Sequence, residues 1–349
     1  MRIVVTGGAG FIGSNLTLAL ACLGHSVVIV DDLSRRGSER NLRRLLDNPE
    51  ISERVTFRKV DIRDVRGCSA ALTGSVRPAD AVLHLAGQTT VTESLTNPLD
   101  DFDINARGTL NLLEATRTHA PEAHFIFAST NKVYGDLKAT KVERHETRYR
   151  MLDYPEGIPE GFPTGAVSPY GCSKLAGDCY VRDYGRTFGM DTTVLRLSCI
   201  YGNWQNGMAG QGWVSWLVKS ALNGSGVTIY GDGIQTRDLL HIDDLVSALL
   251  TVIVDRRGIG ETFNVGGGPR FTISLWAEFG PLLERILRRT VPVRYEARRL
   301  GDQDVYVSDI RKLSSALSWS PRKSPEEGVA ELVQWLTVEL GLTGAIAHP

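Results

Sequence analysis

The chain is poor in the features that mark secreted, membrane-spanning and metal-binding proteins. Its 349 residues include only five cysteines, and no apolar run approaches the roughly 20 residues that a membrane span needs. A signal peptide is not apparent either, so we expect a cytoplasmic protein. Because no Cys-x-x-Cys pair or histidine cluster accompanies the cysteines, we expect reduced thiols and no metal site. The cysteines are Cys22, Cys68, Cys172, Cys179 and Cys199.

Charge of neither sign is in excess. The 39 Lys and Arg residues nearly balance the 40 Asp and Glu residues, which gives a formal net charge of -1. No overall field therefore attracts the chain to nucleic acid or to an anionic membrane. We expect a small molecule as its partner.

Short apolar runs alternate with segments of helical period through the first part of the chain. The runs are apolar on both faces, which is typical of buried parallel strands joined by helices. We therefore predict an α/β fold, a doubly wound parallel Rossmann sheet with a smaller, interleaved C-terminal substrate domain. Strands are expected at 2–6, 27–30, 55–60, 81–85, 125–128 and 193–197, and helices at 11–23 and 169–188. The Rossmann domain is expected at 1–200, with an interleaved return around 235–265, and the substrate domain at 201–340.

The segment 135–168 interrupts this alternation with charged, proline-rich and glycine-rich sequence. It is too long for an ordinary connection between two elements. We therefore expect a lid or a binding loop there.

Three glycines follow the first expected strand at a spacing that suits a dinucleotide. Gly7, Gly10 and Gly13 lie between that strand and the next helix, where they permit a tight turn and close approach of a pyrophosphate. Asp31 ends the second strand, where a carboxylate can accept hydrogen bonds from ribose hydroxyls and repel a 2′-phosphate. This pattern favours NAD over NADP, although Arg35 could in principle bind such a phosphate.

Tyr170 and Lys174 stand four positions apart, so a helix would place both on one face. An ammonium and an oxidised nicotinamide would each lower the pKa of the phenol and let it act as a base. Thr130 follows an expected strand and can hold the reacting alcohol against Tyr170. Alone, the Tyr-x-x-x-Lys pattern is as typical of a surface helix, but downstream of a dinucleotide turn it indicates hydride transfer to NAD.

Five stretches carry a resemblance to a known family. They are STNKVYGD at 129–136, ETRY at 146–149, SPYGCSK at 168–174, QGWVSW at 211–216 and RDLLHIDD at 237–244. Through them the chain resembles the extended short-chain dehydrogenase/reductase (SDR) family, in its nucleotide-sugar epimerase branch. Within that branch it is most similar to the CDP-paratose 2-epimerase group, also called CDP-tyvelose epimerases.

The resemblance implies an NAD-dependent isomerase. In family members that eliminate water, the catalytic threonine is followed by an Asp-Glu pair, whereas Asn131 and Lys132 stand here. Dehydration is therefore disfavoured, and the implied reaction is epimerisation at C2 of a CDP-deoxyhexose through a transient keto sugar. A C4-epimerase of a UDP-hexose and a non-catalytic NAD-binding sensor are the alternatives. The implied partner is a nucleotide-diphosphate sugar, with a CDP-sugar favoured, and the chain is expected to form a homodimer or homotetramer.

The expected site residues follow from these motifs and from the resemblance. Thr130, Tyr170 and Lys174 are expected to be catalytic. For NAD binding we expect Gly7, Gly10, Phe11, Ile12, Gly13, Asp31, Asp32, Ser34, Arg35, Asp61, Ile62, Leu85, Ala86, Gly87, Gln88, Asn105, Tyr170 and Lys174. For substrate binding the resemblance implies Asn131, Lys132, Cys199, Gln211, Tyr230, Arg237 and Arg299. Without the resemblance, Arg237 and Arg299 are more typical of surface ion pairs with Asp238 or Asp302.

Overall fold

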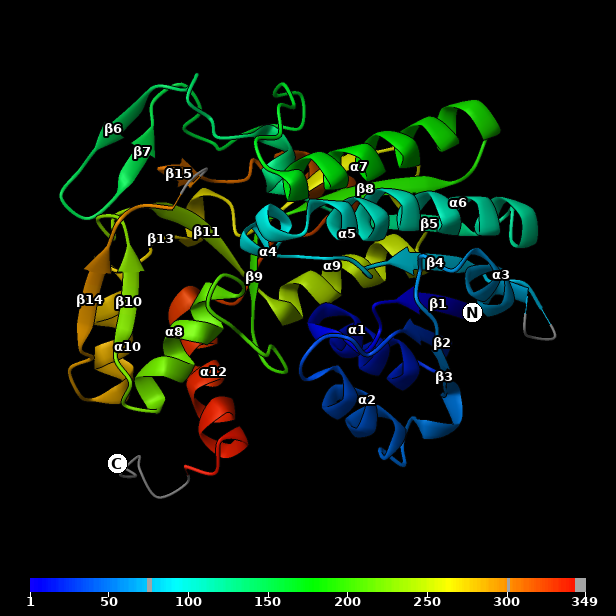
Figure 1. Ribbon diagram of the computed structural model, residues 1–349, viewed down its shortest axis with the longest axis horizontal. Helices are drawn as coiled ribbons and strands as arrows, with labels where there is room; N and C mark the ends of the chain where they lie inside the picture. The colour runs from blue at the N-terminus through cyan, green and yellow to red at the C-terminus, as the bar shows by residue number, and fades with distance from the viewer. Residues whose placement is uncertain (74–76, 300–301, 343–349) are drawn as a thin grey trace.

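The computed structural model describes residues 1–73, 77–299 and 302–342, and its largest element is a seven-stranded parallel sheet (Figure 1). The strand order is β12-β8-β5-β4-β1-β2-β3, so it reverses between β1 and β4. A crevice opens at the carboxyl ends of strands where such an order reverses. The predicted doubly wound, Rossmann-like sheet is confirmed. Its strands are β1 (Arg2–Thr6), β2 (Ser26–Asp31), β3 (Val55–Lys59), β4 (Ala81–His84), β5 (His124–Thr130), β8 (Thr192–Leu197) and β12 (Thr262–Val265).

Helices cover both faces of this sheet. On one face α1 (Phe11–Cys22) packs against α9 (Ile242–Val254), and α2 (Ser38–Leu46) lies beside α1. On the other face α3 (Val65–Thr73), α6 (Gly108–His119) and α7 (Pro169–Phe188) follow one another (Figure 1). The short helices α4 (Val91–Thr96) and α5 (Pro98–Phe102) precede α6 and contact α7.

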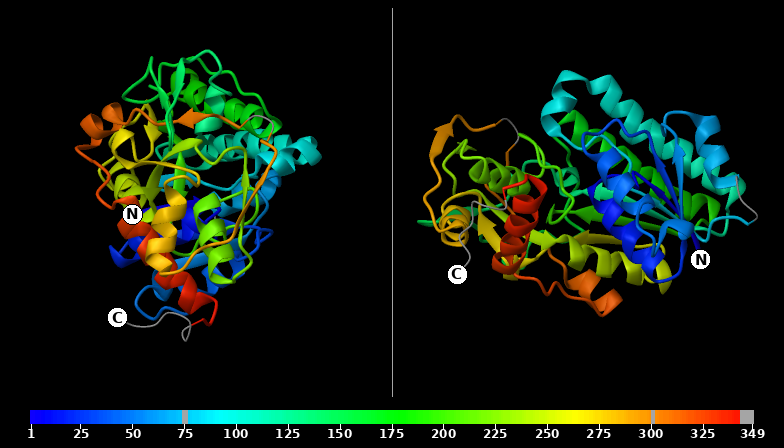
Figure 2. Two further views of the ribbon diagram at one scale, coloured as in Figure 1. Left: turned by 90° about the vertical axis from the view of Figure 1, so that its left-hand side faces the viewer. Right: turned by 90° about the horizontal axis from the view of Figure 1, so that it is seen from below.

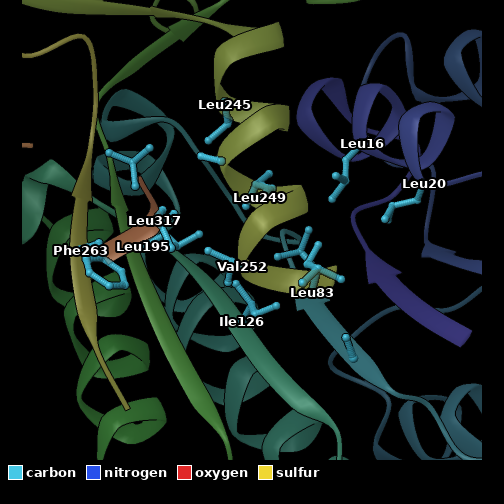
Figure 3. Close-up of a cluster of buried hydrophobic side chains, with 14 of the residues drawn as sticks. Leu16, Leu20, Leu83, Ile126, Leu195, Leu245, Leu249, Val252, Phe263 and Leu317 are labelled. Carbon is cyan, nitrogen blue, oxygen red and sulfur yellow. The ribbon is translucent and has the colours of Figure 1, made fainter. Parts of the chain in front are cut away.

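Two apolar clusters hold the helices to the sheet because alternate residues of each strand face opposite sides. Ile126 of β5 faces α9, whereas its neighbours Phe125 and Phe127 face α6 and α7. Figure 3 shows the first cluster, in which Leu16 of α1 and Leu249 of α9 meet side chains of the sheet. Each fully buried side chain of this kind contributes about 1.5–3 kcal/mol. The sheet is therefore a rigid base for the loops at its edge.

A second lobe lies beside the sheet, on the left in Figure 1. Its core joins α8, α12 and α10 to the small sheets around β10 and β11. After β11 the chain returns to the first lobe through α9 and β12, and α11 packs there as well. The predicted domain boundaries remain a prediction. The elements are β9 (Cys199–Tyr201), α8 (Trp213–Leu222), β10 (Val227–Tyr230), β11 (Thr236–His241), β13 (Thr272–Ser274), α10 (Phe279–Leu287), β14 (Val293–Glu296), β15 (Val305–Tyr306), α11 (Arg311–Leu317) and α12 (Pro325–Glu339).

The long segment 135–168 contains a hairpin, β6 (Val142–Arg144) and β7 (Tyr149–Met151), that is docked on the second lobe. The Tyr149 amide donates to Thr236 Oγ1 at 3.0 Å, and its hydroxyl donates to Asp232 at 2.7 Å. Arg148 pairs with Glu278 at 2.7 Å. The segment is thus held in place at both its backbone and its side chains. Among the described residues, no helix has the length and apolar character needed to cross a bilayer.

Candidate active site

The loop between β1 and α1 leaves no room for side chains. Gly7 has a φ of +68°, and a Cβ there would lie 2.7 Å from the amide nitrogen of Ala86. A Cβ on Gly13 would lie 2.3 Å from the carbonyl oxygen of Gly7. No side chain caps α1, whose first turn begins at Phe11 after Gly10. The open first-turn N–H groups, which include those of Phe11 and Ile12, therefore fit a pyrophosphate.

Asp31 stands at the carboxyl end of β2 and is 7% exposed. Its two oxygens accept N–H bonds from Ala9 at 3.0 Å and Leu33 at 2.9 Å. Burial raises the pKa of Asp31, and these two hydrogen bonds oppose the rise. Each oxygen retains a lone pair that could accept a ribose hydroxyl. Next to it, Asp32 accepts the amide and hydroxyl of Ser34 and fixes the loop.

Asp61 lies beyond the end of β3 and is already paired. Arg63 donates to it at 2.7 Å, and this hydrogen bond lowers the pKa of Asp61. The side chain of Ile62 is buried in the core under α6. The predicted roles of Asp61 and Ile62 in NAD binding remain a prediction.

Gly87 and Asn105 lie against each other beyond the carboxyl end of β4, after Leu85 and Ala86. A Cβ on Gly87 would lie 2.8 Å from Asn105 Oδ1. Asn105 is buried, and its Nδ2 donates to the carbonyl of Gln88 at 3.1 Å. Its Oδ1 is buried with no hydrogen-bond partner among the described residues. An unsatisfied acceptor beside bare backbone fits a ligand that brings a donor. Together with the glycine loop, these residues fit NAD.

The helix α7 positions the two predicted catalytic side chains. Ser168 Oγ accepts the N–H of Gly171 at 3.1 Å, and proline occupies the first turn. Gly189, with a φ of +68°, ends the helix. Both are ordinary start and stop signals. Tyr170 and Lys174 thus lie one turn apart near the helix N-terminus.

Tyr170 meets Thr130 at the carboxyl end of β5. Burial raises the pKa of Tyr170, while the neighbouring Thr130 and the charge of Arg35 lower it. The charge of Asp101 raises it further. Thr130 also donates to Asn131 Oδ1 at 3.4 Å, so Asn131 lies against the same hydroxyl. The structure brings the predicted base and the predicted positioning hydroxyl together.

Lys174 is buried, and its Nζ donates to the carbonyl oxygen of Ala128 at 2.5 Å. The ammonium also lies 4.2 Å from the centre of the Phe127 ring. Burial lowers the pKa of Lys174 to about 7, against the opposing charges of Asp178 and Asp101. Its predicted roles toward Tyr170 and the nicotinamide ribose remain a prediction.

Arg35 lies in the loop between β2 and α2, and it connects this loop to the second lobe through Gln211. Its guanidinium donates to Thr89 Oγ1 and to Gln211 Oε1. Burial lowers its pKa, and the charges of Glu93 and Tyr170 raise it. A residue predicted to bind cofactor thus contacts Gln211, which the resemblance assigns to the substrate.

A group of predicted substrate residues converges on β11. Arg237 donates to Asp302 at 2.7 Å and to the carbonyl of Gln303 at 2.8 Å. Lys132 Nζ donates to Gln303 Oε1 at 3.3 Å, and burial together with Arg237 lowers its pKa to about 8. Burial raises the pKa of the Cys199 thiol, and the charges of Arg237 and Lys132 oppose the rise. These two cations and the thiol therefore share one site.

Without the resemblance, the sequence predicts surface ion pairs for Arg237 and Arg299. This prediction is wrong for both residues. Arg237 pairs with Asp302 in the interior, with only 7% of its side chain exposed. Arg299 instead lies over the ring of Tyr230, 3.8 Å from its centre. Asp238 accepts from Ser198 at 2.5 Å, away from Arg237.

Two buried acids, Asp101 on α5 and Asp178 on α7, were not predicted. Asp101 accepts from Ser173 at 2.5 Å and from Asn105 at 3.2 Å. Asp178 is fully buried and pairs with Arg196 at 2.9 Å. Asp178 lies four residues after Lys174 on the helix, and this spacing could have indicated it.

The family assignment rests on a match over most of the chain. Residues 3–266 match the model of the NAD dependent epimerase/dehydratase family. The chain belongs to this family, which confirms the predicted SDR enzyme and its NAD cofactor.

Individual relatives include epimerases and dehydratases. A CDP-paratose 2-epimerase from Salmonella typhi is 40% identical over 96% of this chain and 99% of its own. A dTDP-glucose 4,6-dehydratase from Escherichia coli is 34% identical over 96% of this chain and 92% of its own. The crystal structure of a UDP-glucose 4-epimerase from Thermotoga maritima with UDP-glucose is similar to this structure, with a TM-score of 0.84 and 32% sequence identity. The match covers 97% of this chain and 100% of that chain.

Proposed function

We propose that the protein is an NAD-dependent nucleotide-sugar epimerase that inverts C2 of a CDP-linked deoxyhexose through a transient keto sugar. The observation that carries this proposal is the placement of buried Tyr170 beside Thr130, close enough for Thr130 to lower its pKa, next to the loop that fits a dinucleotide. The similarity to CDP-paratose 2-epimerase supports the substrate class.

Each of these side chains has a task in that reaction. When bound, NAD would accept a hydride from the sugar carbon and return it. Tyr170 would take the proton of the sugar hydroxyl, while Thr130 would hold that hydroxyl in place. The positive charges of Lys174 and Arg35 would favour the phenolate. Arg237 and Lys132 would bind the diphosphate, so that the sugar can turn while the nucleotide stays bound.

Elimination of water must be distinguished from epimerisation, since a dehydratase is among the relatives. Asn131 and Lys132 follow Thr130, and neither carries a carboxylate. In the resembling dehydratases, the acid and the base of the elimination are an Asp-Glu pair at these two positions. Their replacement supports epimerisation.

The test uses CDP-paratose with the purified protein in deuterated water, followed by NMR of the sugar. We expect the C2 epimer to form without deuterium at the inverted carbon, because the same hydrogen leaves and returns. Absence of an epimer, or deuterium at that carbon, would contradict the proposal.

A C4-epimerase of a UDP-hexose is the second candidate, favoured by the structural similarity to UDP-glucose 4-epimerase. A panel of CDP-, UDP- and GDP-sugars separates the two. Faster conversion of UDP-glucose than of CDP-paratose would favour the C4 reaction. A non-catalytic NAD sensor would have no need of Thr130, Tyr170 and Lys174, and turnover of any sugar in the panel would exclude it.

A further inference from the structure

A cavity lies between α2 of the first lobe and α12 of the second, and none of the residues that line it is among the predicted site residues. The space between its walls is about 390 Å³ when the part that opens to solvent is counted. The right-hand view of Figure 2 shows α12, in red, on the side of the second lobe that faces the blue helices of the first. The loop at Trp204 and the helix α8 supply the remaining walls.

Cations from both lobes surround this cavity. Arg40 and Arg44 line it from α2, and Lys219 lines it from α8. Arg36 lies close enough to Lys219 to lower its pKa. Glu339 on α12 pairs with both Arg40 and Arg44. Among the described residues that line the cavity there are thus three cations and one carboxylate, with Arg36 nearby.

Of the three described cations that line the cavity, Lys219 is the one for which no partner is found. It is half-buried, and neither an acid nor a hydrogen-bond acceptor pairs with its ammonium in the part of the chain that the structure describes. Burial lowers the pKa of Lys219, and the neighbouring charges of Arg36 and Arg40 lower it further. Removing a charge partly from water without a partner is unfavourable. A bound anion would supply the missing partner of the Lys219 ammonium and offset this unfavourable free energy.

Arg44 is held in a fixed position at the cavity wall. Its guanidinium carbon lies 5.7 Å from the centre of the Trp204 ring and 5.8 Å from that of Trp335. It also donates to Asn41 Oδ1 at 3.3 Å. An arginine fixed between aromatic rings presents its planar donors with little loss of side-chain entropy, which suits the oxygens of a phosphate.

We propose that this cavity binds a small phosphate-bearing anion, with Lys219 and Arg44 as its principal ligands. A phosphate dianion matches the excess of cations better than a carboxylate does, because it carries more charge and more acceptor oxygens. Since Lys219 and Glu339 belong to the second lobe and Arg44 to the first, the anion would bridge the lobes. The site is independent of the proposed reaction.

The probe is inorganic phosphate, added to the full-length protein with saturating NAD at constant ionic strength, with chloride as the matched salt. Binding is followed by tryptophan fluorescence, since Trp204 and Trp335 lie at the cavity, and by ³¹P NMR line width. We expect saturable binding that Lys219→Met weakens at least about tenfold. Lys138→Met removes the same charge from an exposed side chain and should leave the affinity unchanged.

Glu339→Gln should have the opposite effect on the affinity for phosphate. Because it removes the one competing carboxylate, it should tighten phosphate binding, a result that a purely structural ion pair would not produce. Arg237→Gln separates this cavity from the candidate active site, and phosphate binding should persist in that variant. Unchanged affinity in Lys219→Met, or loss of binding in Arg237→Gln, would overturn the proposal. Thermal melting of each variant confirms that it is folded.

Discussion

Arg237 and Asp302 form a buried ion pair at the predicted substrate end of the site. The Arg237 guanidinium lies 2.7 Å from the Asp302 carboxylate and also donates to the carbonyl of Gln303. Lys132 lies near enough for Arg237 to lower its pKa. Two cations therefore share one acid, which leaves positive charge for a diphosphate.

Arg237→Gln should weaken nucleotide binding. A hydrogen bond to a charged group contributes about 1.5–3 kcal/mol, which corresponds to roughly a 10- to 150-fold change in affinity. Calorimetric titration with CDP and with UDP measures the change. Arg285→Gln, which breaks an exposed ion pair with Glu326, is the matched control. Equal affinities in the two variants would remove Arg237 from the nucleotide site.

Lys174 should make stability depend on pH in the NAD-free protein. Its pKa is about 7 when folded, against about 10.4 for an exposed lysine. Between these values the unfolded chain binds more protons, so the stability of the wild-type protein should rise with pH relative to Lys174→Met. This contribution is fully present above about pH 10.4 and is lost as pH falls toward 7.

Urea unfolding of both proteins from about pH 6.5 to pH 10 measures that difference. Lys138→Met is the control, because the side chain of Lys138 is 86% exposed. A difference between wild type and Lys174→Met that stays constant with pH would show that Lys174 is charged in the folded protein across the range.

Local signals predicted much of the fold. The bounds 169–188 of α7 follow from Ser168 and Pro169 at its start and Gly189 at its end, and the structure has the same bounds. The buried strands follow from runs that are apolar on both faces. These features depend on residues close together in the sequence.

Contacts between distant residues could not be predicted in this way. Asp101 lies 72 positions from Ser173, and no spacing rule joins them. The sequence alone favours a pairing of Arg237 with Asp238, but the two are neighbours on β11. Neighbouring side chains of a strand face opposite sides, so Arg237 meets Asp302 while Asp238 meets Ser198. To predict the partner of each side chain, one must know which residues pack on each side of the strand.

Gly13→Ala should destabilise the dinucleotide loop and weaken NAD binding. The added Cβ would meet the carbonyl oxygen of Gly7 at 2.3 Å, and backbone can yield little. Overpacking of this kind costs about 1–3 kcal/mol. Thermal melting and calorimetric titration with NAD measure the two effects. Gly161→Ala, where a Cβ meets nothing within 4 Å, should change neither.

Tyr170→Phe should abolish turnover and leave NAD bound, because only the hydroxyl that transfers the proton is removed. General acid–base groups contribute about 10²- to 10⁴-fold to rate, so kcat should fall by at least about 10²-fold. Kinetics with CDP-paratose and quantification of NAD released on denaturation measure both expectations. Tyr180→Phe removes a phenol hydroxyl from an exposed position of the same helix and should leave kcat unchanged. If Tyr170→Phe keeps wild-type turnover, the proton must leave the sugar by another group, and the place of Tyr170 beside Thr130 would then serve only to pack α7 against β5.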